Sequence, residues 1–271
     1  MSEGRWTRRL LGAGTLATLA FIYLPIAVIA LYAFNSGRTQ AWPIEGLTLH
    51  WFEEAFSNPG VRAALLLSVK AALGATLVAM ALGTLAALAV SRYAFFGRNT
   101  VSFLVLLPIA LPGIVTGMAL NATFTEVLGP LGVPFGLFTI IVGHATFCIV
   151  VVYNNAVARL RRMARSLDEA SADLGADSWR TFRRVTLPQL GSALLAGALL
   201  TFALSFDEVI VTTFTAGADR TLPLWILDNY ARPNQVPIVN VVAVVVIVMS
   251  VIPVWIAQRL SSGSSGLTRE R

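Results

Sequence analysis

The segment Arg159–Leu190 (RLRRMARSLDEASADLGADSWRTFRRVTLPQL) is a charged stretch that lies between two long apolar segments. Ser166 and Glu169 have the spacing of a helix capping box, and Gly175 follows where a left-handed residue would end the helix. The Asp-Ser pair at 177–178 can cap a second helical segment. We therefore predict a compact helix–turn–helix. A structured polar insert in an otherwise apolar chain is expected to dock on a partner.

The composition of the chain indicates a membrane protein. Of its 271 residues, 56% are hydrophobic and 13% are charged, whereas a soluble domain has roughly 25% charged residues. The net charge of +6 comes almost entirely from arginine, since Lys70 is the only lysine. Nucleic-acid binding is disfavoured because the arginines lie between apolar segments, where membrane topology already explains them. The single cysteine, Cys148, lies in an apolar run and is interpreted as a small buried residue.

Six segments are long enough to cross about 30 Å of hydrocarbon as helices. They are predicted at 10–34, 62–90, 101–127, 136–158, 192–214 and 236–257. The first follows three arginines and is longer than the roughly 7–15 apolar residues of a secretory signal, so we interpret it as an uncleaved span. The fold class is thus predicted to be an all-α integral membrane protein with six transmembrane helices.

The distribution of arginine predicts the orientation of these spans. Fifteen arginines lie in the two termini, the loop at 91–100 and the segment Arg159–Leu190, against four on the opposite side. The positive-inside rule then places both termini and this segment in the cytoplasm. The predicted organisation is a tail at 1–9, a membrane domain at 10–258 that contains the loop 159–190, and a flexible tail at 259–271.

Two further stretches suggest features of a transport protein. Pro108 and Pro112 are four residues apart in the third span, where they remove helix hydrogen bonds and predict a kink or break. In the first external loop, an amphipathic turn around Trp51 and Phe56 is suited to the membrane interface, which is its preferred interpretation.

The fifth predicted span contains the acidic pair Asp207 and Glu208, preceded by Ser205. Adjacent carboxylates at membrane depth cost several kcal/mol unless water, a cation or a partner solvates them. One interpretation is that they line a solute pathway. The other is that the helix ends near Phe206 and both acids are solvated, and the residues alone leave the two interpretations open.

The sequence lacks the patterns of several catalytic and metal sites. The only lysine follows a valine, so a phosphate-binding P-loop is not possible. The two histidines and one cysteine are far apart, which predicts no metal site, and no arrangement of nucleophile and base predicts a catalytic residue. Uphill transport would therefore need a separate ATPase or an ion gradient.

The spacing within the charged loop resembles a known family. Glu169-Ala170-Ser171, three residues, Gly175, nine residues and Val185-Thr186-Leu187-Pro188 resemble the EAA loop of binding-protein-dependent ABC importer permeases. The family pattern has alanine at position 171 and isoleucine at position 185, so both departures are small. LPIALPGIVT at 107–116 and TFALSFDEVIVTTFTAG at 201–217 resemble the spermidine/putrescine-type permeases in particular.

This resemblance implies a six-helix, type I ABC importer (MetI-like) permease fold in the bacterial inner membrane. Its implied partners are a homologous second permease, two ATPase subunits that bind ATP and Mg, and a solute-binding protein. The chain itself would bind no cofactor. The implied ATPase-coupling residues are Glu169, Ala170, Ser171, Gly175, Leu187 and Pro188. The candidate residues for a cation pathway are Asp207, Glu208, Ser205 and Trp51.

The resemblance favours polyamine import by alternating access, with a separate subunit hydrolysing ATP. The same machinery could import another small amine or amino-acid-like solute, such as 4-aminobutyrate. A different class, an ion-coupled secondary transporter, would be expected to have internally related halves. No convincing repeat relates the first three spans to the second three, and the spacing of the EAA loop argues against this class.

Overall fold

The computed structural model describes residues 5–164 and 166–263. Within them every regular element is a helix, and one isolated antiparallel bridge pairs Asn35 with Leu47. Residues 1–4 and 264–271, which belong to the two predicted tails, lie outside the described residues. The predicted all-α fold class is confirmed for the described chain.

Among the described residues, five helices are long and apolar enough to cross a membrane. They comprise α1 (Arg5–Ala33), α3 (Pro59–Arg92), α6 (Leu137–Leu160), α9 (Leu187–Phe206) with the short helices before it, and α12 (Val236–Gly263). Each overlaps a predicted span. Their large exposed apolar side chains are suited to contact with lipid rather than water.

The sixth candidate span is a bent pair of helices, α4 (Arg98–Ala110) and α5 (Gly113–Val127). Their axes differ by 105° at the break. Pro112 precedes α5 with φ −58° and ψ 130°, an extended conformation that cannot continue the helix. Pro108 lies inside α4. The predicted break in the third span is confirmed and lies at Leu111–Pro112.

Short helices connect the long ones. They are α2 (His50–Ser57), α7 (Ser166–Asp173), α8 (Ser178–Thr181), the π-helix η1 (Phe182–Thr186), α10 (Ile210–Thr215), α11 (Leu222–Tyr230) and the 3₁₀ helix η2 (Pro233–Gln235). Two of the long helices reach into segments that were predicted to be tails. The helix α1 begins at Arg5 rather than near Leu10, and α12 runs to Gly263, because a helix can continue past its apolar part.

The described chain divides into two compact units. One contains the described residues before position 63 together with residues 225–248. The other contains residues 63–224 and the described residues after 248. The loop 159–190 and the acidic pair both belong to the second unit.

The second unit is built on α6, which packs against α4, α9 and α10. An alanine-rich face of α3 also packs on α6. A methyl group on Gly83 of α3 would lie 2.9 Å from the Ile149 carbonyl oxygen, and one on Gly197 of α9 would lie 3.6 Å from the Val152 Cα. Small residues therefore let three helices approach closely. Cys148 is fully buried in this core, as predicted.

In the first unit, α2 is amphipathic, but the face it buries packs against protein. Trp51 is buried, and its indole N–H donates to the Asn35 carbonyl oxygen at 2.8 Å. Ala55 is also buried, whereas Phe56 is exposed. The amphipathic turn is confirmed. Trp51, however, holds the loop after α1 instead of projecting outward.

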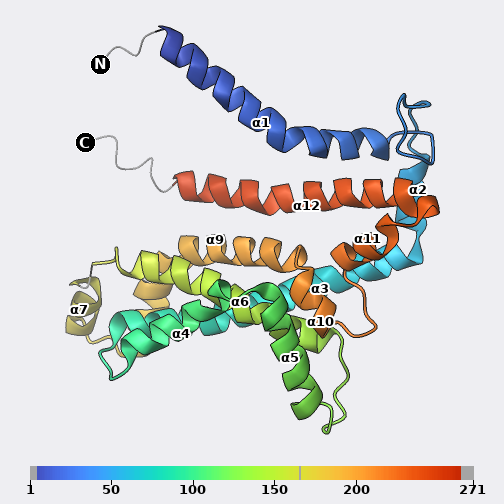
Figure 1. Ribbon diagram of the computed structural model, residues 1–271. Helices are drawn as coiled ribbons and strands as arrows, with labels where there is room; N and C mark the ends of the chain where they lie inside the picture. Colours follow the sequence, from blue (N-terminus) through green and yellow to red (C-terminus); the bar gives the residue numbers. More distant parts are fainter. Residues whose placement is uncertain (1–4, 165, 264–271) are drawn as a thin grey trace. The chain divides into compact units, whose positions relative to one another are not determined.

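Figure 1 shows how the second unit is arranged. The helices α6 and α9 run side by side, with α7 near one end of the pair and α10 near the other. The charged loop and the acidic pair are therefore at opposite ends of α9.

Candidate functional site

The loop between α6 and α9 contains α7, and a glycine forms the turn that ends this helix. Gly175 has φ +78°, in the left-handed region that favours glycine. Its N–H donates to the Ala172 carbonyl at 2.8 Å, and the Ala176 N–H donates to the Ser171 carbonyl at 3.1 Å. These two bonds form a Schellman motif. The predicted left-handed stop at Gly175 is confirmed.

The second half of the loop begins with a capped helix. The Asp177 carboxylate accepts the Arg180 N–H at 2.8 Å, which satisfies a free donor at the start of α8. From there the chain continues through the π-helix η1 directly into α9. The Ser171 and Thr181 hydroxyl oxygens are 3.0 Å apart and join the two halves of the loop.

An ion pair anchors this loop to the end of α3. An Asp168 carboxylate oxygen lies 2.7 Å from Arg92 Nη1, and both side chains are more than two-thirds buried. The Thr186 hydroxyl donates to the other Asp168 oxygen at 3.4 Å. Arg159 donates from Nε to the Gln189 carbonyl at 2.8 Å. Partial burial reduces solvent screening, so the Asp168–Arg92 attraction is stronger than that of a typical surface pair, and it links α7 to the end of α3.

Sequence reasoning missed Asp168 and Arg92. Arg92 was counted only as one of the positive charges of a loop. Asp168 is next to the EAA-like triplet but outside it. The two positions are far apart in the chain, and no spacing rule pairs them.

The outer face of the loop is exposed and contains large apolar side chains. Leu174 is 88% exposed and Trp179 is 66% exposed. Glu169 and Ala170 are also exposed, whereas Ser171 is only partly so. A rigid, hydrogen-bonded surface with an exposed leucine and tryptophan can bury them against a partner protein.

The two remaining predicted coupling residues start the next helix. Leu187 is the first residue of α9, and Pro188 follows it directly after the π-helix η1. Both side chains are exposed. All six predicted coupling positions thus belong to one continuous segment, but Glu169 and Ala170 lie on its surface while Gly175 shapes its turn.

At its other end, α9 stops before the acidic pair. The helix ends at Phe206 and α10 begins at Ile210, so the span predicted to Phe214 is interrupted, and the alternative in which the helix ends near Phe206 is confirmed. Asp207 occupies the C-cap position of α9. A Glu208 carboxylate oxygen accepts the Val211 N–H at 2.9 Å and so caps the first turn of α10.

A buried histidine of α6 holds this break. His144 is 1% exposed; its Nδ1 lies 2.7 Å from the Ser205 hydroxyl and its Nε2 lies 2.8 Å from the Thr212 hydroxyl. The Thr212 hydroxyl donates its only proton to the Glu208 carbonyl at 2.7 Å. Nε2–H must therefore donate to Thr212, which leaves Nδ1 to accept from Ser205. His144 therefore links α6 to both helices that flank the break.

Both acids border a cavity of about 350 Å³, which is lined by Ala203, Leu204, Asp207, Glu208 and Ser250. Asp207 is exposed, and no described residue forms an ion pair or hydrogen bond with its carboxylate. Glu208 is partly buried and uses one oxygen to cap α10. A free carboxylate beside an open space is suited to an ammonium group, which forms charge-assisted hydrogen bonds with it.

Ser205 and Trp51, the other two predicted pathway residues, are buried. Ser205 is 3% exposed and is bonded to His144, and Trp51 is 6% exposed and is bonded to Asn35. In this conformation neither polar group is available to a solute. The structure brings Asp207, Glu208 and Ser205 together, with only the two acids facing the cavity.

No group of three or more His, Cys, Asp or Glu side chains is close enough to hold a metal ion within residues 5–164 and 166–263.

Comparisons with known proteins assign the chain to a family of transport proteins. The sequence pattern described as "Binding-protein-dependent transport system inner membrane component" matches residues 79–265. The putrescine transport system permease protein PotI of Escherichia coli K12 is 32% identical, over 84% of this chain and 82% of that protein. The spermidine/putrescine permease PotC of Haemophilus influenzae is also 32% identical, over 89% and 92% of the two chains.

Solved structures show the same fold. A bacterial ABC transporter that imports the acidic polysaccharide alginate aligns with a TM-score of 0.69 at 17% identity, covering 97% of this chain and 99% of that chain. The MetNI methionine ABC transporter in an inward-facing conformation aligns with a TM-score of 0.56 at 20% identity, over 76% and 98%. With this fold and this sequence pattern, the chain belongs to the inner-membrane permeases of binding-protein-dependent ABC importers.

Proposed function

We propose that this permease imports polyamines of the putrescine and spermidine class. The names of its relatives support this substrate class, and so does the free Asp207 carboxylate beside the cavity at the end of α9. Polyamines carry ammonium groups separated by apolar carbon chains, and this cavity combines two carboxylates with alanine and leucine. Import of another small amine, such as 4-aminobutyrate, is the competing substrate assignment.

The proposed complete importer contains a homologous second permease, two ATPase subunits and a solute-binding protein. The family description supports a binding protein, and one structural relative is an alginate transporter in complex with its pentasaccharide-bound periplasmic protein. ATP and Mg would be bound by the ATPase subunits, because this chain has no P-loop lysine. The arginine distribution supports placing both termini and the loop 159–190 on the cytoplasmic side.

In this proposal the residues of the loop have two different tasks. Glu169, Ala170, Leu174 and Trp179 form the surface that docks into the ATPase. Gly175, Ser171 and the Asp168–Arg92 pair keep that surface in shape. The single observation that carries the docking proposal is the combination of a rigid internal hydrogen-bond network with exposed large apolar side chains.

Transport would proceed by alternating access. ATP binding closes the ATPase pair and moves the docked loops, which rocks the permeases against each other and opens the pathway outward. Hydrolysis then resets the inward-open state. Asp207 is the proposed principal cation contact, and Glu208 is the secondary one because it also caps α10. Ser205 supports the break through His144 rather than contacting the solute.

Membership of the family excludes the ion-coupled secondary transporter as the preferred class. This family contains components of binding-protein-dependent systems, and the loop between α6 and α9 has a shape suited to docking.

The substrate assignment is tested by replacing Asp207 with asparagine in the assembled importer. Asp207→Asn removes the charge at nearly constant volume. The KM for putrescine uptake is therefore expected to rise about tenfold, which corresponds to the loss of one charge-assisted hydrogen bond. Glu126→Gln, an exposed acid at the end of α5, is the matched control. Competition with unlabelled 4-aminobutyrate separates the two substrate assignments. Unchanged putrescine kinetics in Asp207→Asn would reject the pathway role.

A further inference from the structure

We propose that the pocket between the ends of α3, α4 and α6 is a binding site for a phosphate group. The pocket has a volume of about 280 Å³ and is lined by Val90, Ser91, Arg92, Arg98, Val157, Leu160, Arg161 and Met163. The pocket shares Arg92 with the anchor of the charged loop, but its ligand chemistry does not depend on the proposed transport substrate.

The polar lining consists of three guanidinium groups and one hydroxyl. Arg92 is the last residue of α3, Arg98 the first of α4, and Arg161 follows the end of α6. No acid lines the pocket, and Asp168, which contacts Arg92 from α7, is the single carboxylate that pairs with any of the three arginines among the described residues. The partial negative charge at the ends of α3 and α6 offsets some of the repulsion. Within the described part of the chain, the guanidinium groups of Arg98 and Arg161 have no carboxylate partner.

Two polar atoms of this pocket are buried and have no partner. Ser91 Oγ and Arg92 Nη2 are shielded from solvent, and neither forms a hydrogen bond with any described residue. Arg92 binds Asp168 through Nη1 only, so the second arm of its planar fork is unused. Leaving a buried polar group unsatisfied costs roughly 1–3 kcal/mol, and more for a charged one. A bound anion that accepts a hydrogen bond from either atom would remove part of this cost.

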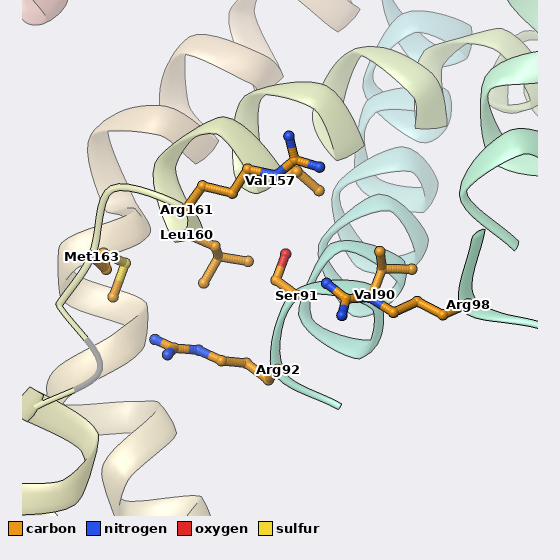
Figure 2. Close-up of a pocket in the computed structure, with 8 residues that line it drawn as sticks. All are labelled: Val90, Ser91, Arg92, Arg98, Val157, Leu160, Arg161 and Met163. Atoms are coloured by element: carbon orange, nitrogen blue, oxygen red, sulfur yellow. The ribbon is translucent and has the colours of Figure 1, made fainter. Parts of the chain in front are cut away.

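Figure 2 shows the directions of these side chains. The Ser91 hydroxyl points into the space between α3 and α6, while Arg98 and Arg161 extend from separate elements on either side of it. Arg92 extends toward the loop that follows α6. Donors that arrive from several directions suit a tetrahedral phosphate, which has acceptor oxygens on all sides, better than a flat carboxylate.

The apolar part of the lining strengthens this preference. Val90, Val157 and Leu160 are buried around the guanidinium groups, which lowers the local dielectric constant and strengthens attraction to an anion. The volume far exceeds the roughly 10–15 Å³ needed for one ordered water. A phosphate could come from an anionic lipid headgroup or from solution, and basic pockets between membrane helices are suited to lipid headgroups.

The test uses the full-length chain purified in detergent, with two probes. One is dioleoyl phosphatidylglycerol, whose bound copies are counted by native mass spectrometry. The other is inorganic ³²P-phosphate in equilibrium dialysis. We expect saturable binding of one probe per chain, weakened at least tenfold in Arg98→Gln and Arg161→Gln. Arg162→Gln, the adjacent exposed arginine outside the pocket, is the matched control and should bind as the wild type does.

Two additional measurements guard against misfolding and simple charge effects. Arg161→Lys keeps the charge but not the planar fork, so its affinity should lie between those of the wild type and Arg161→Gln. Thermal unfolding in detergent should be similar for Arg161→Gln and Arg162→Gln. Binding of the lipid alone or of free phosphate alone identifies the source of the phosphate group. Binding of neither probe, or an equal loss in Arg162→Gln, would overturn the proposal.

Discussion

The loop at the start of α9 and the break at its end have their hydrogen bonds and their exposed side chains arranged in opposite ways. In the loop, internal bonds from Asp168, Ser171 and Gly175 leave a leucine and a tryptophan on the outside. At the break, the bonds of His144 are buried, and the Asp207 carboxylate borders a cavity with no partner among the described residues. The first arrangement is suited to binding a protein surface, and the second to binding a small cation.

A single helix joins these two regions. The helix α9 has 20 residues, which corresponds to about 30 Å at 1.5 Å per residue. The loop continues into it without a break, and Asp207 follows its last residue. We infer that a displacement of the docked loop reaches the acidic break through α9 as a rigid body. Substitutions at the two ends should therefore separate effects on stability from effects on coupling.

The largest effect on stability is expected at the break. His144→Leu keeps a similar volume but leaves the Ser205 and Thr212 hydroxyls with fewer partners, which should cost about 2–4 kcal/mol. Thermal unfolding in detergent measures this loss. His50→Leu is the control, since His50 is exposed and its ring nitrogen lies 3.5 Å from the exposed Glu54 carboxylate. Equal melting temperatures for the two variants would show that His144 does not hold the break.

A smaller effect is expected at the turn of the loop. Gly175→Ala forces a side chain into a left-handed conformation at a cost of about 1–2 kcal/mol, which should lower the population of the docking shape and reduce ATP-driven uptake up to about tenfold. Gly191→Ala is the matched control, because Gly191 lies in α9 with open space at its Cβ. It should transport normally. A similar loss of uptake in both variants would contradict the role of the turn.

The smallest effect on stability is expected on the outer face of the loop. Leu174→Ser changes a side chain that is 88% exposed, so the melting temperature of the isolated chain should stay the same. ATPase stimulation by the loaded binding protein should nevertheless fall about tenfold, because an apolar contact with the partner is lost. A lower melting temperature with normal ATPase stimulation would reverse our assignment of this face.

The local features of both regions could be predicted from the sequence, and their long-range contacts could not. Gly175 and Pro112 act through their own backbone geometry, so the turn and the broken span follow from the sequence. The end of α9 at Phe206 was one of two interpretations that the residues left open, because the apolar pattern resumes after the two acids and the break depends on contacts with His144, which is distant in the chain. The Asp168–Arg92 pair was missed for the same reason. The acidic pair itself was identified from the sequence. That Glu208 caps α10 while Asp207 stays free for a cation became clear only from the hydrogen bond that the Val211 N–H donates to Glu208.

The most direct test of the account is ATP-driven uptake of labelled putrescine by the complete importer in proteoliposomes. The wild type should accumulate putrescine only with ATP and the loaded binding protein present. Glu169→Lys reverses a charge on the exposed docking face and should reduce uptake at least tenfold while the chain still inserts into the membrane. Normal ATP-dependent uptake by Glu169→Lys would contradict the claim that this loop transmits the energy of ATP to the permease.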